Sequence, residues 1–142
     1  MKICQMKGIP LINIVRRDEQ VKLLKDEFGC QYILNQTSET FEEDLRSLAK
    51  ELKATVLLEC VGGSFSAKVL ECMPSRSTCV LYGSFREVGL EGFDPLLLIG
   101  RSYKVEGFVL GLFIKSKGLC GVLPLMNKAI SLMNDTTLHS NI

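Results

Sequence analysis

The sequence contains little of what zinc, nucleic-acid and membrane proteins require. It has one histidine, His139, and no Cys-x-x-Cys pair, so the usual zinc ligands are missing and we expect no metal site. Its 17 basic and 16 acidic side chains leave a net charge of +1, which gives no electrostatic basis for binding nucleic acid. No stretch approaches the roughly 18 uninterrupted apolar residues that a membrane-spanning helix needs. The start, "MKICQMKGIP", also lacks the apolar block of a signal peptide.

The six cysteines are scattered, and several of them lie inside apolar runs, as Cys60, Cys79 and Cys120 do. A disulfide framework is typical of small secreted proteins, whereas cysteines buried in apolar segments are typical of reduced proteins. We therefore predict free thiols and an intracellular location, cytoplasmic or mitochondrial.

Apolar runs and amphipathic segments alternate along the chain, which predicts βαβ units and a parallel sheet covered on both faces. Asp18 is expected to cap the helix that follows it, and Gly8 and Gly29 are expected to end helices. The expected strands span 9–17, 30–35, 54–63, 77–83 and 102–110; the expected helices span 18–29, 38–52, 64–73, 94–101 and 123–133, after the end of a helix at 1–8. The fold class is therefore α/β, a doubly wound parallel sheet.

A glycine pair, Gly62 and Gly63, closes the apolar run "ATVLLECVGG". In doubly wound sheets, ligands bind beyond the carboxyl ends of the strands. Glycines at such an end would let the main chain approach a bulky ligand closely. A plain turn between strand and helix is the simpler alternative, and the pair alone does not decide between them.

The order and spacing of four segments carry a more specific signal: "INIVRRDEQVKLLKDEFGCQYILN", "ATVLLECVGG", "MPSRSTCVLYG" and "VEGFVLGLF". Over roughly residues 1 to 115, the chain resembles the Rossmann-like nucleotide-binding domain of the medium-chain dehydrogenase/reductase superfamily. The resemblance is to its zinc-independent branch of quinone oxidoreductases and 2-enoyl thioester reductases. It implies NADPH as the cofactor and hydride transfer to a conjugated carbonyl.

The resemblance also implies which residues would hold the cofactor. Arg16 and Arg17 occupy the strand end that meets the adenosine ribose, where guanidinium groups suit a 2′-phosphate; alternatively, they are a solvated strand end. The remaining implied positions would line the ribose and the nicotinamide: Cys60, Val61, Gly62, Gly63, Tyr82, Gly83, Phe108, Val109 and Leu110. No catalytic residue is implied within the chain, because in this branch the substrate pocket comes largely from another domain.

The chain departs from the family pattern at its start. It contains no G-x-G-x-x-G or similar turn for the pyrophosphate, and the family's first strand should stand before Met1. That strand lies at the centre of the sheet, so a partner chain could supply it, the half-sheets could close up, or the chain could be a fragment. We expect residues 1–133 to form an incomplete Rossmann-type NADP-binding domain and residues 134–142 a polar tail. The alternative function is a non-catalytic structural or interaction subunit derived from such a reductase.

The last expected strand, "YKVEGFVLGLF", would be a sheet edge. In the resembled family such edges pair across a two-fold axis, so we expect a homodimer through this strand. Leu112 and Phe113 would lie in the interface, and Leu112→Lys should then change the oligomeric state in light scattering.

Overall fold

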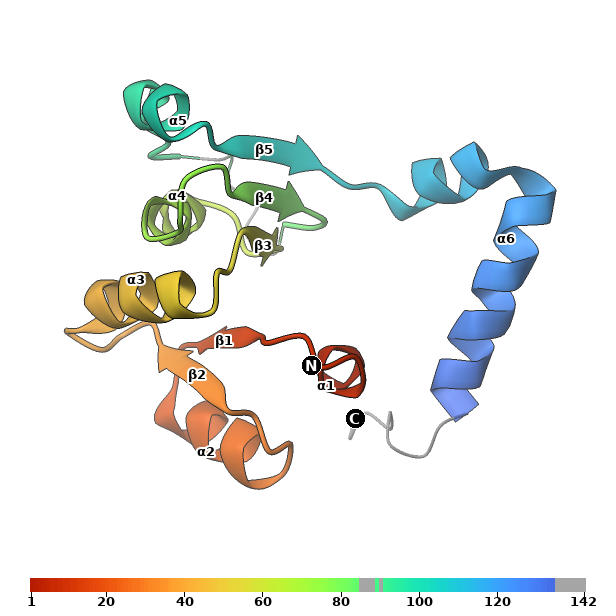
Figure 1. Cartoon of the computed structure of the whole chain (residues 1–142), viewed down its shortest axis with the longest axis horizontal. Helices are drawn as coiled ribbons and strands as arrows, with labels where there is room; N and C mark the ends of the chain where they lie inside the picture. The colour runs from red at the N-terminus through yellow and green to blue at the C-terminus, as the bar shows by residue number, and fades with distance from the viewer. Residues whose placement is uncertain (85–88, 90, 135–142) are drawn as a thin grey trace.

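The computed structural model describes residues 1–84, 89 and 91–134. Helices and strands alternate along them (Figure 1). The elements are α1 Lys2–Met6, β1 Ile12–Val15, α2 Asp18–Asp26, β2 Tyr32–Asn35, α3 Phe41–Glu51, β3 Val56–Glu59, α4 Ser64–Glu71, β4 Thr78–Leu81, α5 Pro95–Arg101, β5 Lys104–Gly107 and α6 Leu110–Asn134. The expected α/β alternation is confirmed, and the expected polar tail, apart from Asn134, lies outside the described residues.

All described strand pairs are parallel, as expected, but the strands form two sheets instead of one. β1 pairs with β2, and β3, β4 and β5 form a second sheet in that order. Figure 1 shows the pair β1–β2 apart from β3–β4–β5. The two half-sheets therefore do not close up into one sheet in the described strands, which excludes one of the three arrangements that the sequence left open.

The start of α2 differs from the expectation. Asp18 is the first helical residue and not the cap; Arg17 precedes the helix in extended conformation. The side chain of Gln20 reaches back, and its Oε1 accepts hydrogen bonds from the backbone N–H groups of Arg16 and Arg17, both at 3.1 Å. Asp18 Oδ1 instead accepts a hydrogen bond from Asn35 Nδ2 at 2.7 Å, which ties the start of α2 to the end of β2.

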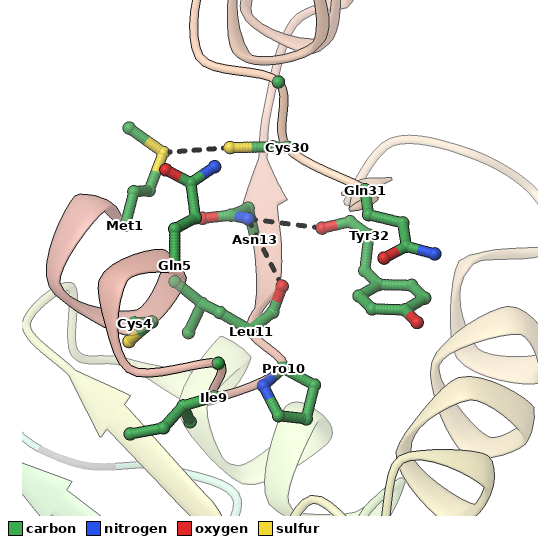
Figure 2. Close-up of a pocket in the computed structure, with 12 residues that line it drawn as sticks. Met1, Cys4, Gln5, Ile9, Pro10, Leu11, Asn13, Cys30, Gln31 and Tyr32 are labelled. Atoms are coloured by element: carbon green, nitrogen blue, oxygen red, sulfur yellow. Dashed lines mark hydrogen bonds between the residues drawn. The ribbon is translucent and has the colours of Figure 1, made fainter.

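The short helix α1 packs beside the amino ends of β1 and β2 (Figure 2). Gln5 Nε2 donates a hydrogen bond to the carbonyl of Phe28 at 2.8 Å, and Cys30 Sγ lies 3.4 Å from Met1 Sδ. Gly8 and Gly29 adopt positive φ values of 62° and 59°, so both glycines close their helices as the sequence predicted. A cavity of about 290 Å³ remains between α1 and the two strands.

Two hydrophobic clusters form the core, and α4 contributes to both. The first contains Phe41, Leu45, Val69 and Cys72, with Ile12, Ile14, Leu34, Leu57 and Phe65 packed against it. The second contains Leu70, Met73, Cys79 and Tyr103, with Leu57, Leu81, Phe93, Leu97 and Leu98 against it. Leu57 of β3 contacts both clusters. Helices α3, α4 and α5 therefore cover one face of β3–β4–β5.

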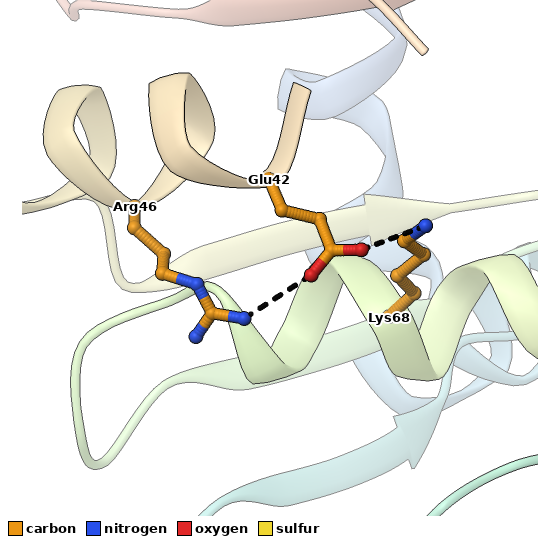
Figure 3. A network of polar contacts seen from close by, with 3 residues as sticks. All are labelled: Glu42, Arg46 and Lys68. Atoms are coloured by element: carbon orange, nitrogen blue, oxygen red, sulfur yellow. Dashed lines mark hydrogen bonds and ion pairs between the residues drawn. The ribbon is translucent and has the colours of Figure 1, made fainter. Parts of the chain in front are cut away.

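A polar contact joins α3 to α4 at the surface. Glu42 Oε1 lies 2.7 Å from Lys68 Nζ, and its Oε2 lies 3.3 Å from Arg46 Nη2 (Figure 3). The hydrogen bond and charge of Lys68 lower the pKa of Glu42, with a smaller contribution from Arg46. Since all three groups are exposed, water screens the pairs, and they orient the helices more than they stabilise them.

The expected last strand is too long. β5 ends at Gly107, and helix α6 begins at Leu110, so Leu112 and Phe113 are helical. β5 does lie at the edge of its sheet, as expected. The expected helix at 123–133 forms the later part of α6, beyond a kink at Gly118, where φ is 60°. In Figure 1, α6 runs away from the sheet to which β5 belongs.

All six cysteines are free thiols, which confirms the expectation. Cys79 is fully buried, and burial raises the pKa of its thiol to about 11, with a smaller effect of the Glu59 charge. Burial also raises the pKa of Cys72. Cys120 is exposed, whereas Cys4 and Cys60 are partly exposed.

At pH 8 we expect Ellman's reagent to modify Cys120 first, then Cys4 and Cys60, while Cys72 and Cys79 react only after denaturation in urea. The thiolate is the reactive form, and the raised pKa values disfavour it in the folded state. Because the folded state holds Cys79 neutral, stability should fall as pH rises from about 9 to about 11. Mass mapping after brief labelling gives the order; early modification of Cys79 would contradict this packing.

Candidate functional site

The carboxyl ends of β3, β4 and β5 are held side by side by main-chain hydrogen bonds. The N–H of Tyr82 donates to the carbonyl of Glu59 at 3.0 Å, and the N–H of Phe108 donates to the carbonyl of Leu81 at 2.7 Å. The residues that follow these strands define the β3–β5 rim: Cys60, Val61, Gly62, Gly63, Tyr82, Gly83, Phe108, Val109 and Leu110. The structure thus brings nine of the eleven expected site residues to the carboxyl ends of the strands of one sheet.

A buried carboxylate fixes the turn after β3. Glu59 is 5% exposed, and its Oε1 accepts hydrogen bonds from the N–H groups of Val61 and Gly62, the latter at 3.0 Å. Backbone donors satisfy the charge and set the path of the chain. The sequence analysis missed Glu59. Its signal was available, since an acidic residue inside an apolar strand end needs a partner when it is buried.

Gly62 and Gly63 both adopt positive φ, 82° and 74°. At Gly63 the ψ of −162° completes a conformation that is essentially restricted to glycine. A Cβ added at Gly63 would meet nothing within 4 Å, so open space borders the main chain there. Gly63 directly precedes α4, whose first turn has no side-chain cap. Gly62 and Gly63 are themselves buried and Ser64, the first residue of α4, is exposed, so a ligand would meet this turn at the positive end of the helix.

Tyr82 and Cys60 meet across the ends of β4 and β3. The Tyr82 side chain is 53% exposed, and its hydrogen bond with Cys60 raises the pKa of the phenol, with smaller effects of burial and of the charges of Cys60 and Glu59. A Cβ added at Gly83 would lie 3.4 Å from Cys60 Cβ, so glycine lets the two strand ends approach. The phenol thus stays neutral and able to donate a hydrogen bond near neutral pH.

Three apolar residues follow β5, and each is exposed: Phe108, Val109 and Leu110. The ring of Phe108 lies 5.6 Å from that of Phe113, and Lys117 Nζ lies 5.2 Å from the centre of the Phe113 ring. The first contact joins the segment after β5 to α6, and the second lies within α6. The expectation that their main chain holds a nicotinamide carboxamide stays a prediction.

Arg16 and Arg17 belong to the other sheet, at the end of β1, so no strand pairing fixes their distance from the rim. Both side chains are exposed. Among the described residues, the ion pairs are those of Glu42, so neither guanidinium has a carboxylate partner. A cavity of about 460 Å³ lies at the end of β2, between the starts of α2 and α3; it is lined by Asp18, Asn35, Thr37, Ser38 and Asp44 among others, and neither arginine lines it. This cavity was not predicted from the sequence, because its polar residues come from separate elements.

The second cavity, drawn in Figure 2, lies at the amino ends of β1 and β2. In parallel α/β sheets, ligands bind at the opposite, carboxyl end. Within its walls Asn13 Nδ2 donates to the carbonyls of Tyr32 at 3.3 Å and Leu11 at 3.4 Å. These bonds fix the segment that connects α1 to β1, so the polar group of Asn13 in the cavity wall has a structural role and does not indicate a ligand. In the described part of the chain, no three histidine, cysteine or acidic side chains gather as a metal site would require.

A parallel α/β fold with glycine turns at its carboxyl rim defines the class of nucleotide-binding domains of dehydrogenases. The family model described as zinc-binding dehydrogenase matches residues 1–128, and the chain belongs to this family, within the medium-chain dehydrogenase/reductase superfamily. The chain is 28% identical over 120 residues to mitochondrial enoyl-[acyl-carrier-protein] reductase from Rattus norvegicus, a match that covers 82% of this chain and 32% of the relative.

Solved structures agree with this assignment. A protein described as an NADPH:quinone reductase from Mesorhizobium loti is 30% identical, with a TM-score of 0.72 over 80% of this chain and 33% of that one. The mitochondrial 2-enoyl thioester reductase Etr1p/Etr2p heterodimer from Candida tropicalis shares the fold at 18% identity, with a TM-score of 0.81 over 99% of this chain and 40% of that one. The chain spans about a third of the length of the curated relatives it matches. None of the described helices has the length and hydrophobicity to span a membrane.

Gly63→Ala should lower the free energy of unfolding by about 1 to 3 kcal/mol, because alanine strains the backbone at this φ and ψ. Gly100→Ala is the matched control: its Cβ also meets nothing within 4 Å, but Gly100 is helical, so the change should be neutral or slightly stabilising. Urea unfolding measures both. Equal stabilities of the two variants would contradict the described turn.

Glu59→Gln should loosen the same turn without changing its size. The amide keeps one acceptor oxygen but loses the charge that strengthens the two bonds, so the free energy of unfolding should fall by about 1 to 3 kcal/mol. Glu43→Gln, at an exposed position of α3, is the control and should be close to neutral. If Glu59→Gln proved as stable as the control, the carboxylate would not be holding the turn.

Proposed function

We propose that this chain is the NADPH-binding part of a reductase that transfers a hydride to a conjugated carbonyl. The observation that carries the proposal is the β3–β5 rim, where the glycine turn held by Glu59 leaves open space beside the main chain. The ribose and the nicotinamide would lie against this turn, Tyr82 and the end of β5. When bound, the cofactor supplies the hydride.

The rim can do three things for such a cofactor. Its glycines admit the sugar close to the main chain, and the uncapped start of α4 favours negative charge nearby. The Tyr82 hydroxyl can donate a hydrogen bond. The exposed apolar residues that follow β5 can exclude water from one side of a planar ring.

Arg16 and Arg17 support NADPH over NADH. Two exposed guanidinium groups without carboxylate partners among the described residues suit the 2′-phosphate. The cavity beside them offers Asn35 and Thr37 to the adenosine portion. Asp18 and Asp44 also line that cavity, and their charge would suit unphosphorylated ribose hydroxyls better. The Asp18 carboxylate already accepts a hydrogen bond from Asn35, so the arginines remain the better partners for the adenosine ribose.

The pyrophosphate has no evident partner, since the chain contains no glycine-rich phosphate turn. The relatives' names, enoyl reductase and NADPH:quinone reductase, support the reaction class, but the chain spans only about a third of their length. Substrate binding is therefore not proposed for these residues. The exposed apolar surface of the chain favours a second candidate function, an interaction subunit, and the predicted homodimer through the β5 edge remains a proposal within it.

Calorimetric titration with NADPH and NADH should show preference for NADPH. Replacing both arginines, Arg16→Ala with Arg17→Ala, should weaken NADPH binding by at least about tenfold and leave NADH binding nearly unchanged, because only NADPH carries the 2′-phosphate. Arg101→Ala, at the end of α5, is the control and should bind like the parent chain.

Two results would overturn the proposal. Equal binding of NADPH by the double variant and the parent would remove the arginines from the site. Absence of binding for both nucleotides would leave the interaction subunit as the better reading of this chain.

A further inference from the structure

The first turn of α4 contains a buried hydroxyl group that has no hydrogen-bond partner. Ser66 is 0% exposed, and among the described residues its Oγ is the one buried side-chain polar atom without a partner. Buried polar groups in folded proteins are nearly always hydrogen-bonded, because an unpaired one is destabilising. Ser66 therefore holds a donor that the described contacts of the chain do not use.

Ser77 shows how a buried serine is otherwise satisfied in this chain. It is also 0% exposed, but its Oγ donates a hydrogen bond to the carbonyl of Pro74 at 2.6 Å. The two serines therefore differ in their partners and not in their burial. Packing alone does not account for the Ser66 hydroxyl, since alanine would leave no unpaired group at this position.

Unpaired main-chain donors lie beside this hydroxyl. α4 spans Ser64–Glu71 and has no side-chain cap. Among the described residues, the N–H groups of Ser64, Phe65 and Ser66 have no hydrogen-bond acceptor. Side chains of a helix lean toward its N-terminus, so Ser66 Oγ lies next to the turn that carries these N–H groups. The hydroxyl and the N–H groups can therefore donate to one ligand.

The beginning of α4 is accessible from solvent at one residue. Gly63 is buried, whereas Ser64 is exposed. A Cβ added at Gly63 would meet nothing within 4 Å, so the space beside the turn is open. A ligand can therefore approach the first turn at Ser64.

The carboxylate of Glu59 precedes this turn, and its negative charge opposes the binding of an anion. Its Oε1 accepts hydrogen bonds from the N–H groups of Val61 and Gly62, which offset part of that charge. These bonds use donors that precede the helix and leave the donors of the first turn free. The partial positive charge of the helix N-terminus favours an oxyanion at those free donors.

We propose that the start of α4 binds a phosphoryl group, with the Ser66 hydroxyl and the N–H groups of the first turn as hydrogen-bond donors. Each phosphate oxygen accepts hydrogen bonds, and helix N-termini suit phosphate because their free N–H groups and their dipole act together. The Ser66 side chain reaches the ligand by rotation about its Cα–Cβ bond. The site offers a phosphate partner in a chain that lacks a glycine-rich phosphate turn.

The phosphoryl group has two sources, the dinucleotide and a free phosphorylated ligand. The proposed function places the ribose next to the nicotinamide against the glycine turn, and the phosphate on that ribose would then meet the start of α4. This source rests on the proposed function, whereas the phosphoryl site itself does not. Inorganic pyrophosphate probes the site alone, and NADPH probes it together with the rest of the rim.

Amide NMR titrations of the labelled chain with pyrophosphate and with NADPH test the site, because they also detect weak binding. Pyrophosphate should shift the amide signals of Ser64, Phe65 and Ser66. Ser66→Ala should weaken its binding by about tenfold or more, since the variant loses a hydrogen bond to a charged group. In urea unfolding, Ser66→Ala should be at least as stable as the parent, because the hydroxyl has no partner to lose.

Ser77→Ala is the matched control for a buried serine. It should lower the stability of the chain, because it removes the hydrogen bond to Pro74, and it should leave pyrophosphate binding unchanged. If Ser66→Ala lowered the stability in the same way and left binding intact, the hydroxyl would have a structural role only, and the site would be overturned.

A second variant removes a main-chain donor. Ser64→Pro deletes the N–H group of the first helical residue, a position where proline is tolerated. It should weaken pyrophosphate binding by about fivefold or more, since one donor to a charged group is lost. Ser64→Ala keeps the N–H group and should bind like the parent.

The results with the two probes separate this site from the proposed function. Pyrophosphate binding that depends on Ser66, without any binding of NADPH, would support the site and contradict the proposed function. NADPH binding without pyrophosphate binding at Ser64–Ser66 would support the proposed function and overturn the site. If both bind and Ser66→Ala weakens both, the dinucleotide is the source of the phosphoryl group; if it weakens pyrophosphate alone, the source is a free phosphorylated ligand.

Discussion

The packing of Leu57 against both hydrophobic clusters connects the two halves of the molecule. The sheets β1–β2 and β3–β4–β5 share no strand pairing, so side chains must do the joining. In the first cluster, Phe41 and Leu45 of α3 meet Val69 of α4, with Ile12 of β1 packed on one side and Leu57 on the other. The hydrophobic effect is non-directional. It holds the two sheets together, but it does not fix their relative position as strand-to-strand hydrogen bonds would.

The consequence for the site is an asymmetry. The β3–β5 rim is set by main-chain hydrogen bonds and by the buried carboxylate of Glu59, so its geometry is rigidly specified. Arg16 and Arg17 sit on the other sheet, and only side-chain packing relates them to the rim. A dinucleotide bound across both would add a second connection between the halves, and it would thereby favour one relative arrangement.

Much of the fold could be predicted from the sequence, because apolar runs and amphipathic segments alternate at clear spacing. The strands around Ile14, Leu34, Leu57 and Cys79 all lie where the pattern put them. The predicted end of the last strand was wrong, since a short apolar run such as "GFVLGLF" has no periodicity that distinguishes a strand from a helix. The sequence also could not decide whether β1 pairs with β3, because in the resembled family a further strand lies between them, and this chain does not contain it.

The positions of the predicted site residues followed from the same pattern, whereas their role as a cofactor site stays a prediction. Glycines and strand ends mark a carboxyl rim in the sequence, and nine expected residues do gather there. The sequence indicates that Glu59 needs a partner, but it does not say which one, since the bonds to the N–H groups of Val61 and Gly62 depend on how the side chain folds back. Asp18 was expected as a cap from its general preference, but it is the first helical residue, and Gln20 instead reaches back to the N–H groups of Arg16 and Arg17 that precede the helix.

The most direct measurement of the central claim is an amide NMR titration of the labelled chain with NADPH. If the β3–β5 rim is the cofactor site, the largest shift changes will fall on Gly62, Gly63, Tyr82 and Gly83, with smaller ones near Arg16 and Arg17. Shifts confined to the amino-end cavity around Asn13 and Tyr32, or no shifts at saturating nucleotide, would contradict the account.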